Sequence, residues 1–66
     1  MYDEAKYQAW CTQVIECALG KRGWVSITHA AKGIGTNKGA LIQFARAAGL
    51  SIDNQSGKHG ITAYKA

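Results

Sequence analysis

The first apolar pattern along the chain is a broad stripe near the N-terminus. Its members recur at spacings of three and four positions: Tyr7, Trp10, Cys11, Val14, Ile15 and Ala18. That spacing places them on one face of a helix, whereas Gln8, Gln13 and Glu16 fall largely on the other face. Asp3 is a suitable N-cap and Gly20 a suitable stop. The pattern therefore predicts an amphipathic helix that begins after Asp3 and ends before Gly20.

Two shorter helices are predicted in the middle of the chain, after one brief strand. Residues 24–27 are aromatic and β-branched, which favours a strand. Thr28 is expected to be the N-cap of a short helix that the glycine-containing residues 33–36 interrupt. Asn37 is expected to cap the next helix, which runs to about residue 48 and ends at the glycine that follows.

The C-terminal part of the chain has the alternation of a β-hairpin. Apolar and polar residues alternate over 50–53 and again over 61–64, and residues 54–60 between them are turn formers. The element order is therefore helix, strand, helix, helix, strand, loop, strand. A chain of 66 residues is long enough for one domain and too short for two. We expect a single α+β domain over residues 1–66.

The two central helices meet the requirements of a helix-turn-helix. Ala31 is small enough for the two helices to cross closely, and Gly35 supplies the turn, where φ is often positive. Apolar residues are expected on the inner face of both helices. They are Ala30 and Ile34 in the first helix, and Leu41, Phe44 and Ala48 in the second.

The stretch from residue 25 to residue 37 resembles the helix-turn-helix of winged-helix regulators. It contains, in order, a short strand, the Thr28 cap, an alanine, a glycine with an apolar neighbour, and the polar cap Asn37. The chain departs from the family at Gly33, where Leu is usual, and at Gly39, where a helix former is usual. The resemblance implies a winged helix: three helices with a C-terminal two-stranded hairpin and a short strand before the second helix. It also implies binding to double-stranded DNA, with the third helix in the major groove and the hairpin loop as the wing.

The charge distribution agrees with a polyanionic partner. The chain carries eight Lys and Arg against four Asp and Glu, for a net charge of +4. Residues 1–20 contain three of the four acids, whereas seven basic residues and one acid follow from Lys21 onward. A basic excess over two thirds of the chain favours a nucleic acid.

Helical angles place four residues of mixed character on the outer side of the third helix. They are Gly39, Ile42, Gln43 and Arg46, with Asn37 and Lys38 at the N-terminal end. Gln43 can hydrogen-bond adenine N6 and N7, and Arg46 can reach a guanine or a phosphate. Ile42 can contact a thymine methyl group, and Gly39 allows a close approach to the groove floor.

Four further residues are expected to contact the DNA backbone. Lys58 in the wing is a candidate for a phosphate or minor-groove contact, and His59 beside it can donate a hydrogen bond. The Thr28 and Thr36 hydroxyls lie near the starts of two helices, where phosphates bind readily. The alternative for the wing is a hairpin tip whose charge serves solubility.

Other chemistry finds no support in the sequence. The possible zinc ligands lack the close pairs of structural zinc sites; they are Cys11, Cys17, His29 and His59. The glycine-rich residues 33–39 fit neither phosphate-loop motif, and no catalytic set has a local signature. A small domain also has little room for a deep cleft. We expect no enzyme activity, no metal, no cofactor and no small-molecule ligand.

The biological role stays open among several alternatives. If the chain binds DNA, we expect a transcriptional regulator, such as a repressor, or a nucleoid-type silencer. A recombination accessory factor is an alternative that would bind DNA in the same way. The expected location is the cytoplasm, at the nucleoid. A different class is a protein-interaction module on the same scaffold. One small module makes few contacts, so a homodimer or cooperative oligomer is also expected. The first helix, with its acidic end and Tyr2 and Tyr7, is the candidate contact surface; the alternative is that it packs inside the domain. No stretch of the sequence suits a membrane span.

Overall fold

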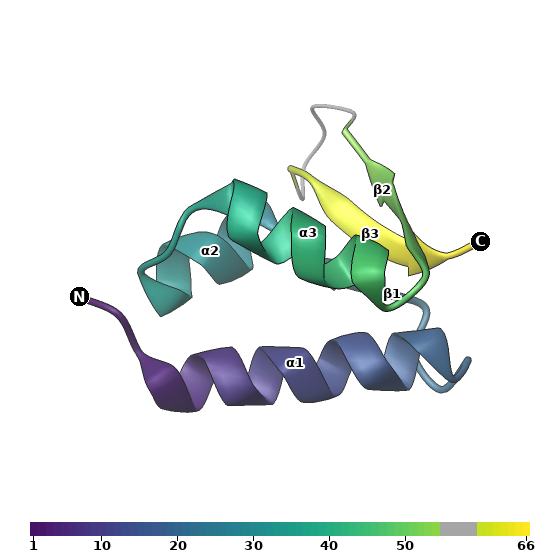
Figure 1. Cartoon of the computed structure of the whole chain (residues 1–66), viewed down its shortest axis with the longest axis horizontal. Helices are drawn as coiled ribbons and strands as arrows, with labels where there is room; N and C mark the ends of the chain where they lie inside the picture. Colours follow the sequence, from purple (N-terminus) through teal and green to yellow (C-terminus); the bar gives the residue numbers. More distant parts are fainter. Residues whose placement is uncertain (55–59) are drawn as a thin grey trace.

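The described part of the chain forms three helices and a three-stranded antiparallel sheet (Figure 1). The computed structural model describes residues 1–54 and 60–66. The elements are α1 (Glu4–Ala18), β1 (Trp24–Ser26), α2 (Thr28–Ile34), α3 (Lys38–Ala47), β2 (Leu50–Asp53) and β3 (Thr62–Lys65). The predicted α+β class and element order are confirmed. The last strand begins one residue later than predicted, and α2 continues through Gly33.

Local capping contacts define where α1 and α3 begin. The Asp3 carboxylate accepts a hydrogen bond from the Lys6 N–H at 3.1 Å, and the Asn37 side-chain oxygen accepts one from the Ala40 N–H at 2.9 Å. Each bond satisfies a backbone donor that the helix itself leaves unpaired. Both predicted N-caps are therefore confirmed.

The sheet has β3 at its centre, with β1 on one side and β2 on the other. The predicted hairpin of β2 and β3 is confirmed, and Ile52 lies opposite Ala63 in it. Val25 of β1 lies opposite the same alanine. Because side chains alternate along a strand, these residues share the inner face of the sheet. Trp24 and Tyr64, which pair across β1 and β3, lie on the outer face and are exposed.

The hydrophobic core lies between α1 and the layer formed by α2, α3 and the sheet (Figure 1). Its fully or almost fully buried members are Trp10, Val14, Cys17, Val25, Ile27, Ala31, Ile34, Leu41, Ala45, Leu50 and Ala63. The predicted stripe of α1 was wrong at its C-terminal end, because Cys17 is fully buried and Ile15 is 53% exposed. None of the helices described here combines the length and the apolar character that a membrane span needs.

Trp10 connects α1 to two other elements. Its indole N–H donates a hydrogen bond of 2.8 Å to the Ser26 carbonyl of β1. Its ring centroid lies 5.7 Å from that of Phe44 in α3 and 6.5 Å from that of Tyr7. A hydrogen bond with the Cys11 side chain raises the pKa of Tyr7 above its usual 10.0, so this phenol is neutral at physiological pH.

The turn between α2 and α3 packs against the N-terminal segment. Gly35 has a φ of +89°, as expected for the turn glycine of a helix-turn-helix. A Cβ atom at this position would collide with the Met1 carbonyl, so the close approach also requires glycine. Beside it, the Asp3 N–H donates a hydrogen bond of 2.6 Å to the Ile34 carbonyl. Asp3 thus starts α1 with its side chain and holds the end of α2 with its backbone.

Thr28 does not cap α2, contrary to the prediction. The N-cap residue is Ile27, and no side chain caps this helix. The Thr28 hydroxyl instead accepts a hydrogen bond of 3.0 Å from the Ile61 N–H, immediately before β3. Gly60 (φ +67°) allows this contact, because a Cβ there would lie 2.8 Å from the Thr28 side chain. The threonine therefore joins the start of α2 to the start of β3.

Substitution of Thr28 by valine tests this connection. Valine has nearly the same shape but leaves the Ile61 N–H without its acceptor in a partly buried place, so we expect the free energy of unfolding to fall by about 1–2 kcal/mol. Thr28→Ser keeps the hydroxyl and serves as the control. Urea denaturation of the three proteins measures the effect, and equal stability of the valine variant and the parent protein would show that the bond contributes nothing.

Candidate nucleic-acid interface

The outer side of α3 presents a continuous exposed surface. Gly39, Gln43 and Arg46 are exposed on it, as the helical angles predicted. Ala40 and Ala47 are exposed on the same side, and the prediction did not include them. Their helical angles place them beside Gln43, but two alanines carry no polar signal in the sequence. The long side chains of Gln43 and Arg46 therefore stand among small residues.

The rotation of α3 differs slightly from the prediction. Leu41 and Ala45 are fully buried, whereas Phe44 is only partly buried. Residues four apart lie about 40° from each other around a helix, so the inward direction falls between Leu41 and Ala45. Ala48, also predicted inward, is half-buried. This rotation turns Ile42 partly into the core, which corrects its placement on the outer side.

The N-terminal end of α3 adds an amide and a cation to this surface. Lys38 is exposed in the first turn, and Asn37 is exposed just before it. The Asn37 side-chain oxygen is engaged in the cap, so its NH2 group is the part that can face a ligand. We name the set Asn37, Lys38, Gly39, Gln43 and Arg46 the α3 surface.

Two predicted phosphate contacts, Thr28 and Thr36, have backbone donors that are engaged within the fold. The Thr28 N–H lies 3.4 Å from the Ile61 carbonyl, and its hydroxyl accepts the bond from the Ile61 N–H. The backbone N–H of Thr36 donates to the Ala31 carbonyl at 3.1 Å, and the residue is half-buried. Both backbone donors thus have partners within the fold. Thr28 has a structural role that the sequence did not reveal.

The predicted wing contacts, Lys58 and His59, lie outside the described residues. The described part of the hairpin begins again at Gly60, which lies against Thr28. The base of the loop on the β3 side is therefore joined to the start of α2. The two wing residues stay predictions from the sequence.

The α3 surface is basic because α3 contains two cations and no acid. Lys38 stands at its N-terminal end and Arg46 in its last turn. Three of the four acids of the chain lie on α1 or at its start: Asp3, Glu4 and Glu16. α1 packs on the opposite side of the core from the outer side of α3 (Figure 1). The outer side of α3 therefore carries positive charge without a carboxylate of its own helix, and this charge attracts polyanions.

Metal-binding groups are not assembled in the part of the chain that the structure describes. No three His, Cys, Asp or Glu side chains gather there in a way that would hold an ion. Cys11 is half-buried, Cys17 is buried, and both are free thiols. Their positions on different sides of α1 agree with the spacing in the sequence.

Comparison with known proteins gives no relative for this chain: no protein-family model, no curated protein and no solved structure matches it. A functional proposal must therefore be drawn from the chemistry of the α3 surface and from the arrangement of the elements that hold it.

The Asn37 cap offers a direct test of how the α3 surface is held. Asn37→Ala removes the acceptor of the Ala40 N–H, and we expect a loss of about 1 kcal/mol in the free energy of unfolding. Asn37→Asp keeps an acceptor and adds a negative charge at a helix N-terminus, so it should be at least as stable as the parent protein. Urea denaturation monitored by circular dichroism distinguishes the two, and an alanine variant of unchanged stability would contradict the cap.

Proposed function

We propose that this chain is a winged helix-turn-helix protein that binds double-stranded DNA through the α3 surface. The observation that carries the proposal is that surface itself: two cations and two amide side chains, without an acid, on the exposed side of a helix. The order α1–β1–α2–α3–β2–β3 supports it, because it is the order of elements in a winged helix. The turn at Gly35 supports it as well, because a helix-turn-helix joins its two helices by a short turn that contains a glycine, and here only residues 35–37 separate α2 from α3.

The dimensions of α3 suit a major groove. An α-helix with its side chains is about 10–12 Å in diameter, which matches the major-groove width of about 12 Å, and the 10 residues of α3 give a length of about 15 Å along the groove. In this proposal Gln43 reads an adenine, and Arg46 contacts a guanine or a phosphate. Gly39 and its small neighbours allow the helix to approach the base edges closely. Ile42 is left out of the reading set because it packs partly against the core.

Phosphate contacts complete the proposed interface. Lys38 and the Asn37 NH2 group stand at the N-terminal end of α3, where the helix dipole also favours an anion. Lys58 and His59 in the loop between β2 and β3 are proposed to follow the DNA backbone or the minor groove. A single helix reads few base pairs, so we expect tight binding to need a second copy on the same DNA.

Salt-dependent binding to duplex DNA tests the proposal. Fluorescence anisotropy with duplexes selected from a random pool should show an affinity that falls steeply between about 50 and 200 mM salt. Lys38→Ala and Arg46→Ala should each lower the slope of log K against log salt by about 0.9 if each cation contacts one phosphate. Gln43→Ala should weaken binding to the selected duplex by about 1–3 kcal/mol and relax the preference at one position.

Lys6→Ala is the matched control for these substitutions. It removes one exposed positive charge from α1, on the far side of the core from the α3 surface, so the salt slope should stay as in the parent protein. Absence of binding to any duplex at low salt would contradict the proposal. An equal effect of Lys6→Ala and Arg46→Ala would show that only net charge matters. The sequences retained from the pool separate a specific regulator from a silencer that prefers AT-rich DNA.

A protein-interaction module is the second candidate, and one observation favours it. Ile15 of α1 and Leu19, the C-cap residue of this helix, lie one turn apart and are 53% and 63% exposed. Exposed apolar side chains of this size are typical of contact surfaces when they gather in a patch. If this candidate is correct, alanine substitutions on the α3 surface leave the biological activity intact, whereas Ile15→Ala and Leu19→Ala abolish it.

A further inference from the structure

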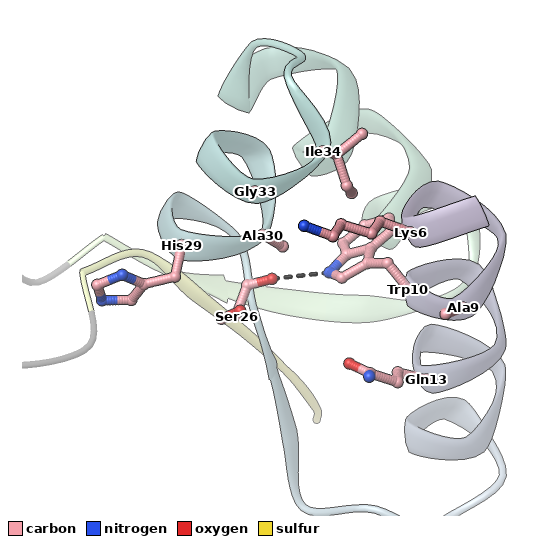
Figure 2. Close-up of a pocket in the computed structure, with 9 residues that line it drawn as sticks. All are labelled: Lys6, Ala9, Trp10, Gln13, Ser26, His29, Ala30, Gly33 and Ile34. Atoms are coloured by element: carbon pink, nitrogen blue, oxygen red, sulfur yellow. Dashed lines mark hydrogen bonds between the residues drawn. The ribbon is translucent and has the colours of Figure 1, made fainter. Parts of the chain in front are cut away.

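A groove of about 330 Å³ lies between α1 and α2, and no residue of the α3 surface lines it (Figure 2). It is lined by Lys6, Ala9, Trp10, Gln13, Ser26, His29, Ala30, Gly33 and Ile34. The volume is at the lower end of the range of small-molecule sites, which begins at about 300 Å³. The groove is therefore large enough for one small organic molecule.

The floor of the groove is apolar and has no unsatisfied donor. Trp10 is only 3% exposed, and its indole N–H is bonded to the Ser26 carbonyl, as the dashed line in Figure 2 shows. Ala30 and Ile34 of α2 complete the apolar lining. A flat hydrocarbon body can therefore lie here without leaving a buried polar group unpaired.

Gly33 keeps the α2 wall of the groove open. Its φ is not positive, so the backbone does not require glycine, and alanine would be a better helix former. A Cβ at this position would meet no atom within 4 Å. The absent side chain thus leaves space beside the groove that a larger residue would fill.

The rim of the groove carries one cation and one amide from α1. Figure 2 shows the Lys6 ammonium group above the Trp10 indole and the Gln13 amide on the other side of it. The His29 ring turns away from the centre of the groove in the same view. No carboxylate lines the groove, and Lys6 forms no ion pair with any described residue. The rim is therefore complementary to an anion with acceptor oxygens.

We propose that this groove binds a small monocarboxylate with a planar apolar body of about ten non-hydrogen atoms. The carboxylate lies between the Lys6 ammonium and the Gln13 amide. The planar body lies over the floor formed by Trp10 and Ala30, in the space beside Gly33. One cation and one amide match the single charge of a carboxylate, whereas phosphate sites are typically built from several cations or backbone donors.

The two tryptophans allow a direct test by NMR. The Trp10 indole N–H lies at the groove floor, whereas Trp24 lies on the outer face of the sheet and reports nonspecific effects in the same spectrum. Titration of the free protein with benzoate and with indole-3-acetate should shift the Trp10 indole signal and leave Trp24 unchanged. We expect a dissociation constant of about 0.1–1 mM for at least one of these probes.

Neutral probes and matched variants identify the cause of any shift. Benzamide has the shape of benzoate without its charge and should bind at least about tenfold more weakly. Lys6→Gln should make benzoate and benzamide bind with equal affinity. Lys32→Gln removes the same charge from α2, outside the groove lining, and should preserve the preference for benzoate. Gly33→Leu should abolish binding by filling the groove, whereas Gly33→Ala should retain part of it. Circular dichroism verifies that both glycine variants fold.

The proposal is overturned if neither carboxylate shifts the Trp10 signal in the millimolar range. It is also overturned if both tryptophans shift together, or if Lys6→Gln binds benzoate as the parent protein does. Because the titration contains no DNA, its failure leaves the proposed function of the α3 surface unaffected. Failure of DNA binding likewise leaves the groove intact.

Discussion

The packing of the Trp10 indole links every layer of this small protein. The ring belongs to α1, its N–H donates to the Ser26 carbonyl of β1, and its centroid lies 5.7 Å from that of Phe44 in α3. It also lines the groove against α2. A chain of 66 residues can bury only about 60% of the surface that it exposes when unfolded. One large aromatic side chain that also has a satisfied hydrogen bond is therefore a large part of its core.

The packing around Trp10 also determines which side of α3 is exposed. Phe44 packs against Trp10 of α1, and Leu41 and Ala45 are buried in the core. With these positions inward, Gln43 and Arg46 necessarily face outward, because a helix presents its residues at fixed angles. The chemistry of the α3 surface is thus a consequence of how the core is filled. The proposed DNA contacts depend on α1, although no residue of α1 takes part in them.

α2 is shared by both surfaces proposed to bind ligands. Its C-terminal end leads through Gly35 into α3, and this turn is held by the Asp3 backbone. Its other side forms one wall of the groove, where Gly33 leaves space. Its start is tied to β3 through the Thr28 hydroxyl. A short helix of 7 residues has little stability of its own, so these tertiary contacts hold it in place.

The sequence by itself determined the features that depend on neighbouring residues. The caps at Asp3 and Asn37, the turn at Gly35 and the hairpin alternation all arise from hydrogen bonds or side-chain angles within a few positions along the chain. The element order and the exposed positions of Gln43 and Arg46 could therefore be predicted. The exposed side of α3 followed from helical angles alone, to within the small rotation that moved Ile42 toward the core.

The tertiary structure decided what depends on residues far apart in the sequence. Thr28 looked like a cap, but its hydroxyl binds Ile61, 33 positions away. Cys17, and not the predicted Ile15, is buried in the core. Which of the two is buried depends on how α1 packs on the rest of the fold, and the spacing of residues along α1 does not specify this. The groove forms where α1 and α2, which are separated in sequence, lie side by side, and Gly33 of α2 has no side chain to fill it. Local hydrogen bonds are encoded by adjacent residues, whereas these contacts appear only when the whole core has formed.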